Sequence, residues 1–593
     1  MNLRLVPTPP QPPPALATVD DIARLTPAFA RALVREFDLA SLAGRLCPVL
    51  LDSGEAAIFA VKEYVHGDAI DELQRMVVAA GYRLAVPRRY QLPAPLLLMI
   101  ARGQLTASGV SGSGAGPQPD RASALAALFL DIVRWGVLQG ASDVHINVNR
   151  RHESCDVRYT INGDYVSTDR FAGLSNDTLL EVLAVAWMDV RGGNGAVFDP
   201  ALEQQGRLAF VVDGVPIVLR WASLAADAGP SVCLRILRLD ATADGNLQTL
   251  GYPPGQIATL LRARDREGGA IVLAGVVGSG KSTTIATLMR GIDPARKVIT
   301  LEDPVEYIIA NALQNTLGGA LAESAWASFD AKLKTIKRSA MNDLLIGEIR
   351  DVNTGRAFMD LASSGISLYA TTHAGAAAMI PERLASDAIG VSRDFLATPG
   401  ILKLLVYQTL LPRLCLACAL PVDSLWRAAD VVGGVEGAYA SYDAAGWRTW
   451  VHALQSTYQL DAGQLRVRNA EGCPACRRAQ LPQLNGTSGR CVAAEMIEPE
   501  RLDGFLDRVR VRDNAGLDKL VREAAFQSGP GANPAWRDWR DWRESATRGA
   551  RALHCALLKV STGEVDPRAL LRRFDVPLEE SAAAVLQTSR GAA

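Results

Sequence analysis

The sequence has no long apolar run and almost no net charge. Among its 593 residues, no stretch reaches the roughly 18 consecutive apolar residues that a membrane-spanning helix needs. Its start, "MNLRLVPTPPQPPPALATVDD", is broken by prolines where a signal peptide requires an apolar segment. A formal net charge of -1 argues against a surface that binds polyanions over its whole extent. We therefore expect a cytoplasmic chain with neither a membrane span nor a leader.

The bulk composition is that of a globular protein. Hydrophobic residues make up 49% and charged residues 21% of the chain, which argues against extensive disorder. A chain of 593 residues is too long for a single core, so several domains are expected. We find no internal repeat. The nine cysteines, in a reducing compartment, indicate metal ligands or core packing rather than disulfides.

Local patterns divide the first half of the chain into segments. The proline cluster at 7–14 predicts an extended arm, and the mixed patterns over 17–103 predict a small α/β or helical unit. Residues 103–120, "GQLTASGVSGSGAGPQPD", are typical of a flexible tether, with a long loop inside one domain as the alternative. Helical spacing over 121–140, followed by period-two strands such as "VPIVLRWAS" and "VCLRILRL", predicts an α+β domain.

From residue 270 the pattern changes to buried strands that alternate with helices. The segments "AIVLAG", "KVITLED", "DLLIGEIRD" and "ISLYATTH" contain apolar runs of the kind found in strands buried on both faces. Strands that alternate with helices in this way predict a parallel sheet. The first strand leads into "GVVGSGKSTT", a Gly-x-x-x-x-Gly-Lys-Ser loop, and a helix-compatible run follows.

This glycine loop is predicted to hold a nucleotide phosphate; the alternative is a surface glycine turn. Glycines let backbone N–H groups turn inward beside the positive end of the next helix. Lys281 is expected to reach the β- and γ-phosphates, and the Ser282 hydroxyl to bind Mg²⁺. The predicted nucleotide-binding residues are Gly275, Gly278, Ser279, Gly280, Lys281, Ser282 and Thr283.

Acidic side chains and one histidine follow three of the buried strands. Glu302, Asp303 and Glu306 come after "VITL", at the carboxyl edge of the predicted sheet where ligands bind. They are candidates to polarise the attacking water or to hold metal-bound water, with a solvated loop end as the alternative. Glu348 is a candidate to sense Mg²⁺, and His373 to sense the γ-phosphate, although a lone histidine there is more often structural.

The order of these motifs resembles one known family. "GVVGSGKSTT", "TLEDPVEY", "LLIGEIRD" and "YATTHA" resemble the Walker A, Asp box, Walker B and His box of the secretion ATPases. These GspE/PilB-like proteins are the motors of type II secretion and type IV pilus assembly. "ASDVHINVNRRHESCDVRYTING", "QQGRLAFVVDGVPIVLRWAS" and "ALHCALLKVSTGEVDP" extend the resemblance over about residues 120 to 585. Asn342, where the family has aspartate, and the altered His box suggest a divergent branch, such as conjugative or type IVb pilus systems.

The resemblance implies a function and a set of partners. It implies a homohexameric ATPase, cytoplasmic and peripheral at the inner membrane, that drives a membrane platform protein and meets a cytoplasmic docking protein, without nucleic acid. In that family, arginines of the amino-terminal half reach the phosphates, and Arg207, Arg220 and Arg235 occupy the matching positions. Judged alone, each of them is more often a surface ion-pair residue. Glu302 or Glu348 would orient the water, with Glu348 also at the Mg²⁺. His373 and the arginines would couple phosphate release to domain rotation.

The implied fold class is α/β, with a RecA-like P-loop core preceded by a PAS-like α+β domain. The expected domains are an N-terminal docking domain with the proline-rich arm (1–103), a linker (104–120), the PAS-like domain (121–240), the RecA-like ATPase domain (241–411), a zinc-binding module (412–493) and a C-terminal helical region (494–593).

Four cysteines form two matched pairs. Cys415-x-x-Cys418 and Cys473-x-x-Cys476 offer the four soft thiolates of a tetrahedral structural zinc site. The resemblance agrees, because export and extension ATPases carry a tetracysteine module that retraction ATPases lack. The cysteines without partner spacing, which we expect in the core, are Cys47, Cys155, Cys233, Cys491 and Cys555.

Three function hypotheses remain besides the assembly motor. They are a pilus retraction ATPase, a nucleotide-binding scaffold without turnover, for which Asn342 is the one supporting feature, and a DNA-translocating motor, which the near-neutral charge disfavours. A tryptophan stripe at Trp536, Trp539 and Trp542 has helical spacing and favours packing over partner docking.

Overall fold

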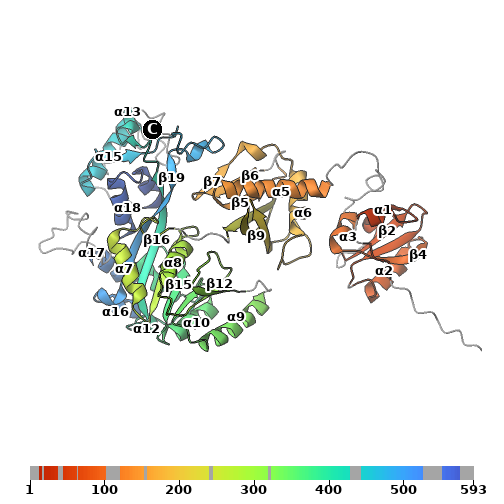
Figure 1. Cartoon of the computed structure of the whole chain (residues 1–593), viewed down its shortest axis with the longest axis horizontal. Helices are drawn as coiled ribbons and strands as arrows, with labels where there is room; N and C mark the ends of the chain where they lie inside the picture. The colour runs from red at the N-terminus through yellow and green to blue at the C-terminus, as the bar shows by residue number, and fades with distance from the viewer. Residues whose placement is uncertain are drawn as a thin grey trace, which may run out of the picture. The chain divides into compact units, whose positions relative to one another are not determined.

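The computed structural model describes ten ranges of the chain (Figure 1), namely 13–16, 19–37, 45–62, 64–101, 121–151, 156–238, 245–317, 322–427, 443–524 and 551–574. Most of the proline cluster, the tether at 103–120, Cys155 and the three tryptophans of the stripe lie outside these ranges. None of the helices in the described ranges has the length and apolarity that crossing a bilayer requires.

Two compact units make up the chain. The first consists of residues 1–131, 175–205 and 224–226, and the second of 132–174, 206–223 and 227–593. The first unit contains a four-stranded sheet in the order β1-β2-β3-β4, so the N-terminal segment is α/β rather than helical. The elements of this segment are α1 (Val19–Ala23), β1 (Phe29–Ala32), η1 (Val34–Glu36), β2 (Leu46–Leu51), β3 (Ala56–Ala60), α2 (Asp68–Ala79), β4 (Leu84–Gln91) and α3 (Ala94–Ala101).

A six-stranded sheet follows, in the order β7-β6-β5-β10-β9-β8. The period-two segment "VPIVLRWAS" lies within β9, and residues 232–238 of "VCLRILRL" lie within β10, because alternating side chains suit a sheet with unlike faces. Trp135 packs on Tyr159, with ring centroids 4.5 Å apart. The elements are α5 (Arg121–Leu138), β5 (Ala141–Asn147), β6 (Asp156–Ile161), β7 (Asp164–Ser167), η2 (Asp169–Phe171), α6 (Asn176–Trp187), β8 (Gln204–Val212), β9 (Val215–Ala226) and β10 (Gly229–Arg238).

The predicted parallel sheet is present and has seven strands, in the order β13-β12-β14-β15-β11-β16-β19. Every neighbouring pair is parallel except β16 and β19, which pair antiparallel. The strands are β11 (Ala270–Ala274), β12 (Val298–Glu302), β13 (Ala312–Thr316), β14 (Asp343–Ile346), β15 (Ser367–Thr372), β16 (Leu402–Leu414) and β19 (Thr487–Ile497).

Helices cover both faces of this sheet (Figure 1), which is why its strands are apolar on both sides. In β11, Val272 packs into one core with α9, α10, α12, α16 and α17, whereas Ile271 and Leu273 pack into a second core with α7 and α8. These helices are α7 (Pro254–Asp265), α8 (Lys281–Arg290), α9 (Ala322–Lys337), α10 (Val352–Ala362), α12 (Arg393–Leu396), α16 (Phe505–Arg510) and α17 (Asn514–Ala524). Shorter elements in this part are η3 (Ala377–Met379), α11 (Ile380–Leu384) and η5 (Pro499–Arg501).

Strands β16 and β19 continue beyond the other strands to a third core. Leu411 of β16 and Cys491 of β19 are fully buried there, together with Trp450. The elements around this core are β17 (Leu420–Pro421), α13 (Ser424–Arg427), α15 (Ala444–Tyr458), β18 (Arg466–Val467), η4 (Pro482–Leu484), α18 (Ala552–Ser561) and α19 (Arg568–Arg573).

Candidate nucleotide site and cysteine cluster

The glycine loop joins the carboxyl end of β11 to the first residue of α8. Gly275, Gly278 and Gly280 have φ values of +154°, +76° and +83°, which residues with a Cβ atom rarely adopt. Gly280 is the N-cap of α8, and no side chain caps this helix end. The first amides of α8 therefore lack the side-chain partner that a capping residue gives, an arrangement suited to binding an anion.

A cavity of about 880 Å³ opens above this loop. The residues that line it include Val276 to Thr283 of the loop and α8, and Glu302, Glu306, Glu348 and His373 from the neighbouring strand ends. The parallel sheet explains this convergence, because the carboxyl ends of β11, β12, β14 and β15 lie at one edge. Arg220 and Arg235, from the six-stranded sheet, also line the cavity.

Lys281 is folded back onto the loop. Its Nζ donates to the carbonyl oxygens of Gly275 (2.9 Å) and Val276 (3.2 Å). Burial lowers the pKa of Lys281, while Glu348 and Glu306 oppose the shift. Ser279 is buried at 2% exposure, and its hydroxyl has no hydrogen-bond partner among the described residues. The loop thus combines a desolvated cation with a free hydroxyl, which fits a phosphate ligand.

Glu302 ends β12 at the cavity. Burial raises the pKa of its carboxyl group, although the hydrogen bond from Gln314 opposes the shift. Gln314 Nε2 donates to Glu302 Oε1 at 3.2 Å, which orients the carboxylate. A half-buried carboxylate of this kind has the raised proton affinity that a general base requires.

Glu348 and His373 contact each other directly. His373 Nε2 lies 2.8 Å from Glu348 Oε1, and its Nδ1 lies 3.1 Å from the Gly275 carbonyl oxygen. The histidine therefore links the Glu348 carboxyl group to the first residue of the glycine loop.

The three predicted arginines have partners in the described structure. Arg207 pairs with the Asp303 carboxylate at 3.0 Å, and Arg220 donates to the Asp303 carbonyl oxygen at 3.3 Å. Arg235 pairs with Asp143 at 3.1 Å. Whether these arginines contact phosphate stays a prediction, as do the roles of Glu302, Glu348 and His373.

Asn342 lies away from the cavity. It precedes β14, and its side-chain oxygen accepts from the Lys297 amide at 2.8 Å, whereas Glu348 follows the other end of the same strand. The adjacent Asp343 is fully buried and forms a bidentate ion pair with Arg296. Its two carboxylate oxygens lie 2.8 Å from Arg296 Nε and 2.9 Å from Arg296 Nη2. Asn342 therefore does not belong to the lining of the cavity.

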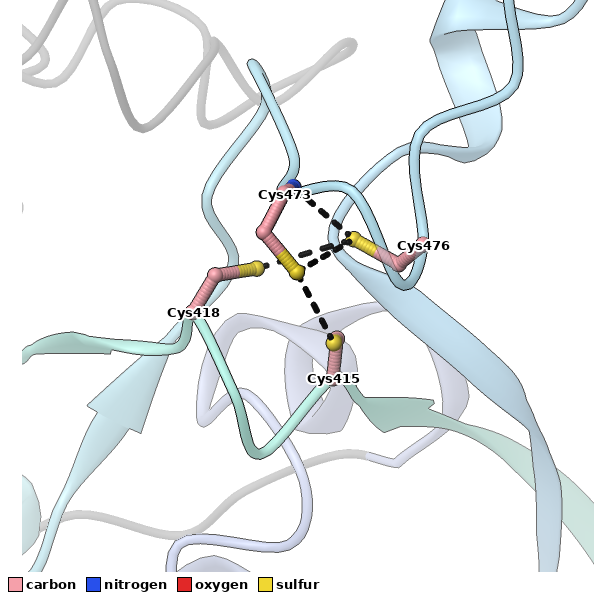
Figure 2. A group of neighbouring side chains, drawn as sticks. All are labelled: Cys415, Cys418, Cys473 and Cys476. Atoms are coloured by element: carbon pink, nitrogen blue, oxygen red, sulfur yellow. Dashed lines mark hydrogen bonds between the residues drawn. The ribbon is translucent and has the colours of Figure 1, made fainter.

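The two cysteine pairs come together in space (Figure 2). Their sulfur atoms all lie within 4.8 Å of one another. Three of the sulfur–sulfur distances are 3.8 Å (Cys415–Cys473), 3.6 Å (Cys418–Cys476) and 3.8 Å (Cys473–Cys476). A zinc ion with bonds of about 2.3 Å to four sulfurs requires edges of about 3.8 Å, so the cluster fits tetrahedral zinc. The amides of Cys473 and Gly486 both donate to Cys476 Sγ at 3.3 Å, as they would to a thiolate.

Several residues that line the cavity are not among the predicted site residues. Arg350, which belongs to the segment "LLIGEIRD", lies 3.5 Å from the Asp303 carboxylate. Tyr307, which follows the Asp box, forms a hydrogen bond with Thr283 at 2.9 Å. Arg490 of β19 donates to the Gly278 carbonyl oxygen at 3.3 Å, and its sequence context carried no signal.

Comparisons with known proteins agree on the family. The profile of the family described as "Type II/IV secretion system protein" matches residues 120–520. The "Type II secretion system protein HxcR" of Pseudomonas aeruginosa is 30% identical over 318 residues, which are 53% of this chain and 62% of that protein. The "Type IV pilus assembly ATPase PilB" of Thermus thermophilus is 29% identical over 292 residues, 49% of this chain and 31% of that protein.

A solved structure is also similar. It is titled "Crystal Structure of the Pilus Retraction Motor PilT and Bound ADP", is 18% identical, and has a TM-score of 0.42 over 76% of this chain and 97% of that chain. This chain spans less than two thirds of the length of either curated relative described above.

Proposed function

The chain belongs to the family described as "Type II/IV secretion system protein", and from this membership we propose that it is an ATPase motor of a type II secretion or type IV pilus machine. The observation that supports this most directly is the convergence of the glycine loop, Glu348 and His373 on one cavity. The names of the two curated relatives, a type II secretion protein and a pilus assembly ATPase, point to the same kind of machine.

In the proposed reaction the loop grips the triphosphate. Lys281 gives up its bonds to the Gly275 and Val276 carbonyls and turns its ammonium group to the phosphates. Magnesium, when bound, neutralises charge on the phosphate oxygens, and Ser282 and Glu348 are the residues that would hold it. The uncapped N-terminus of α8 adds backbone donors at the same place.

Glu302 is the candidate base for the attacking water. Its half-buried carboxyl group has a raised pKa, and Gln314 holds it in position. His373 bridges Glu348 and the loop, so a change at the phosphates would reach β15 through its hydrogen bonds. Arg207 and Arg220 would exchange Asp303 for phosphate oxygens, which would couple the six-stranded sheet to the nucleotide state.

The direction of work that we favour is assembly rather than retraction. The support is the cysteine cluster, whose geometry suits the zinc module that the resemblance associates with export and extension motors. We further propose a homohexamer that acts at the inner membrane through a platform protein, with residues 1–103 as the docking domain. The likeness of 121–240 to a PAS domain and the RecA-like character of 241–411 belong to this proposal.

Nucleotide binding and phosphate release by the full chain test the proposal. We expect Lys281→Ala to abolish both, and Glu348→Gln to keep binding while slowing release by about a hundredfold or more. Lys337→Ala is the matched control, because Lys337 pairs with Asp360 on the surface, and it should behave as the wild type. Equal release by the wild type and Glu348→Gln would favour a scaffold without turnover. Stimulation by DNA would favour a translocating motor.

A further inference from the structure

A chain of buried hydrogen bonds lies directly beneath the glycine loop. Gln408 of β16 is fully buried, and its Nε2 donates to the Ser279 carbonyl oxygen at 2.7 Å. The Tyr252 hydroxyl donates to Gln408 Oε1 at 2.6 Å. The hydroxyl oxygens of Tyr252 and Thr284 lie 3.1 Å apart. Since the Tyr252 proton is used on Gln408, Thr284 is the donor in that contact.

The orientation of the Gln408 amide follows from its partners. The Ser279 carbonyl oxygen can only accept, so the amide group that faces it must be the NH₂. The Gln408 oxygen then faces Tyr252, whose hydroxyl supplies the proton it needs. Both side chains are at most 2% exposed, so water does not replace either partner. Each residue thus holds the next one in a single orientation.

This chain determines where a backbone amide of the loop points. A trans peptide is planar, with its C=O and N–H directed to opposite sides. Because Gln408 holds the Ser279 carbonyl beneath the loop, the N–H of Gly280 must point away from Gln408. Gly280 lines the nucleotide cavity, so this is the side on which an anion would bind.

Tyr252 also belongs to the segment that leads from the six-stranded sheet to the seven-stranded one. It follows β10 and immediately precedes the N-cap of α7. The two residues before it are held by β19 and α18. The Leu250 carbonyl accepts from the Val492 amide (2.8 Å), and the Gly251 carbonyl accepts from the buried Lys559 (2.7 Å). A change in this segment would therefore act on the tyrosine hydroxyl.

We propose that Gln408 is a positioning residue for nucleotide binding, held by Tyr252, and that this pair connects the interdomain segment to the phosphate-binding loop. The inference rests on the proposed function, since it assigns the residues that keep the loop amide directed at the nucleotide. We assign no catalytic role to either Gln408 or Tyr252. Their effect is on the geometry of the loop.

The test measures the affinity of fluorescent ADP with Mg²⁺ for the full chain, together with its thermal unfolding. Tyr252→Phe removes one oxygen atom, and we expect affinity to fall about three- to tenfold. Gln408→Met, which keeps the length of the side chain but lacks the donor, should lose about tenfold or more. The double variant should bind no more weakly than Gln408→Met, because both changes break the same chain. In steady-state assays KM should rise more than kcat falls.

Two matched variants separate positioning from general stability. Tyr369→Phe removes another buried tyrosine hydroxyl, which contacts Asp343 at 3.3 Å near the opposite end of the strands. Gln256→Met removes another fully buried amide, which donates to the Ala494 carbonyl at 2.8 Å. Both controls should lose thermal stability to a similar degree and keep their affinity within about twofold.

The outcomes distinguish this inference from the proposed function. If the wild type binds, Lys281→Ala does not, and Tyr252→Phe binds as tightly as the wild type, the inference is wrong and the proposed function stands. An equal loss of affinity in Tyr369→Phe would also overturn it. If the wild type itself binds no nucleotide, both fail. Should Gln408→Met not fold, Tyr252→Phe still decides the matter, because it changes a single atom.

Discussion

Removal of metal from the cysteine cluster should measurably destabilise the part of the chain around it. A metal ion bound by Cys415 and Cys473 would close a loop between residues 58 positions apart. The chain-entropy relation for a cross-link of that length gives about 4 kcal/mol at 25 °C, and a metal clip closes the loop in the same way. We therefore expect chelation to lower the unfolding free energy of this part by about 4 kcal/mol, since freed thiols no longer restrict the unfolded chain.

The measurement combines metal analysis with urea unfolding followed by tryptophan fluorescence. Trp447 and Trp450, two of the ten tryptophans of the chain, belong to the core next to the cluster and contribute to the emission. Cys473→Ser should lose most of the bound zinc and the same stability as the chelated wild type. Cys491→Ala is the control, because Cys491 is fully buried but its sulfur contacts the Leu411 carbonyl instead. That variant should keep about one zinc per chain.

Two results would refute this reasoning. One is a purified wild type that carries no zinc even when it is prepared with zinc and reductant. The other is a chelated protein whose unfolding free energy stays within about 1 kcal/mol of the loaded form, because the loop-closure argument then has no basis.

Three other predictions concern pH, a buried ion pair and the loop. Burial, with Arg551 nearby, lowers the pKa of His554 from 6.5 to about 4, so the unfolded chain takes up this proton before the folded chain does as pH falls below 6.5. The free energy of unfolding should therefore drop by about 2 kcal/mol by pH 5. His554→Gln should flatten this dependence of stability on pH. Asp343→Asn leaves the Arg296 guanidinium without its counter-ion and should cost about 3 kcal/mol in urea unfolding, with nucleotide affinity unchanged. Gly275→Ala should reduce fluorescent ADP binding at least about tenfold, since its Cβ would lie 2.4 Å from the Gln408 carbonyl at a φ of +154°; wild-type affinity in that variant would contradict the loop geometry.

The sequence was sufficient to predict the features that depend on a few consecutive residues. The apolar runs "AIVLAG" and "ISLYATTH" predicted buried strands, and β11 and β15 are parallel neighbours in the sheet. Three positive φ values in six residues require glycines, so the loop was recognisable from its composition and from the strand before it. The cysteine pairs were recognisable in the same way, because a knuckle needs two thiols three residues apart.

Other features depended on which strands become neighbours. Gln408 lies within the apolar run "ILKLLVYQTLL", and nothing in its spacing shows that β16 pairs beside β11 and brings an amide under the loop. Likewise, the partners of Arg207 and Asp343 come from distant elements. Sequence by itself determined the elements and the loop, because periodicity and backbone preference act over a few residues. Only the tertiary structure decided the buried polar contacts, because strand order and register bring together side chains that are far apart along the chain.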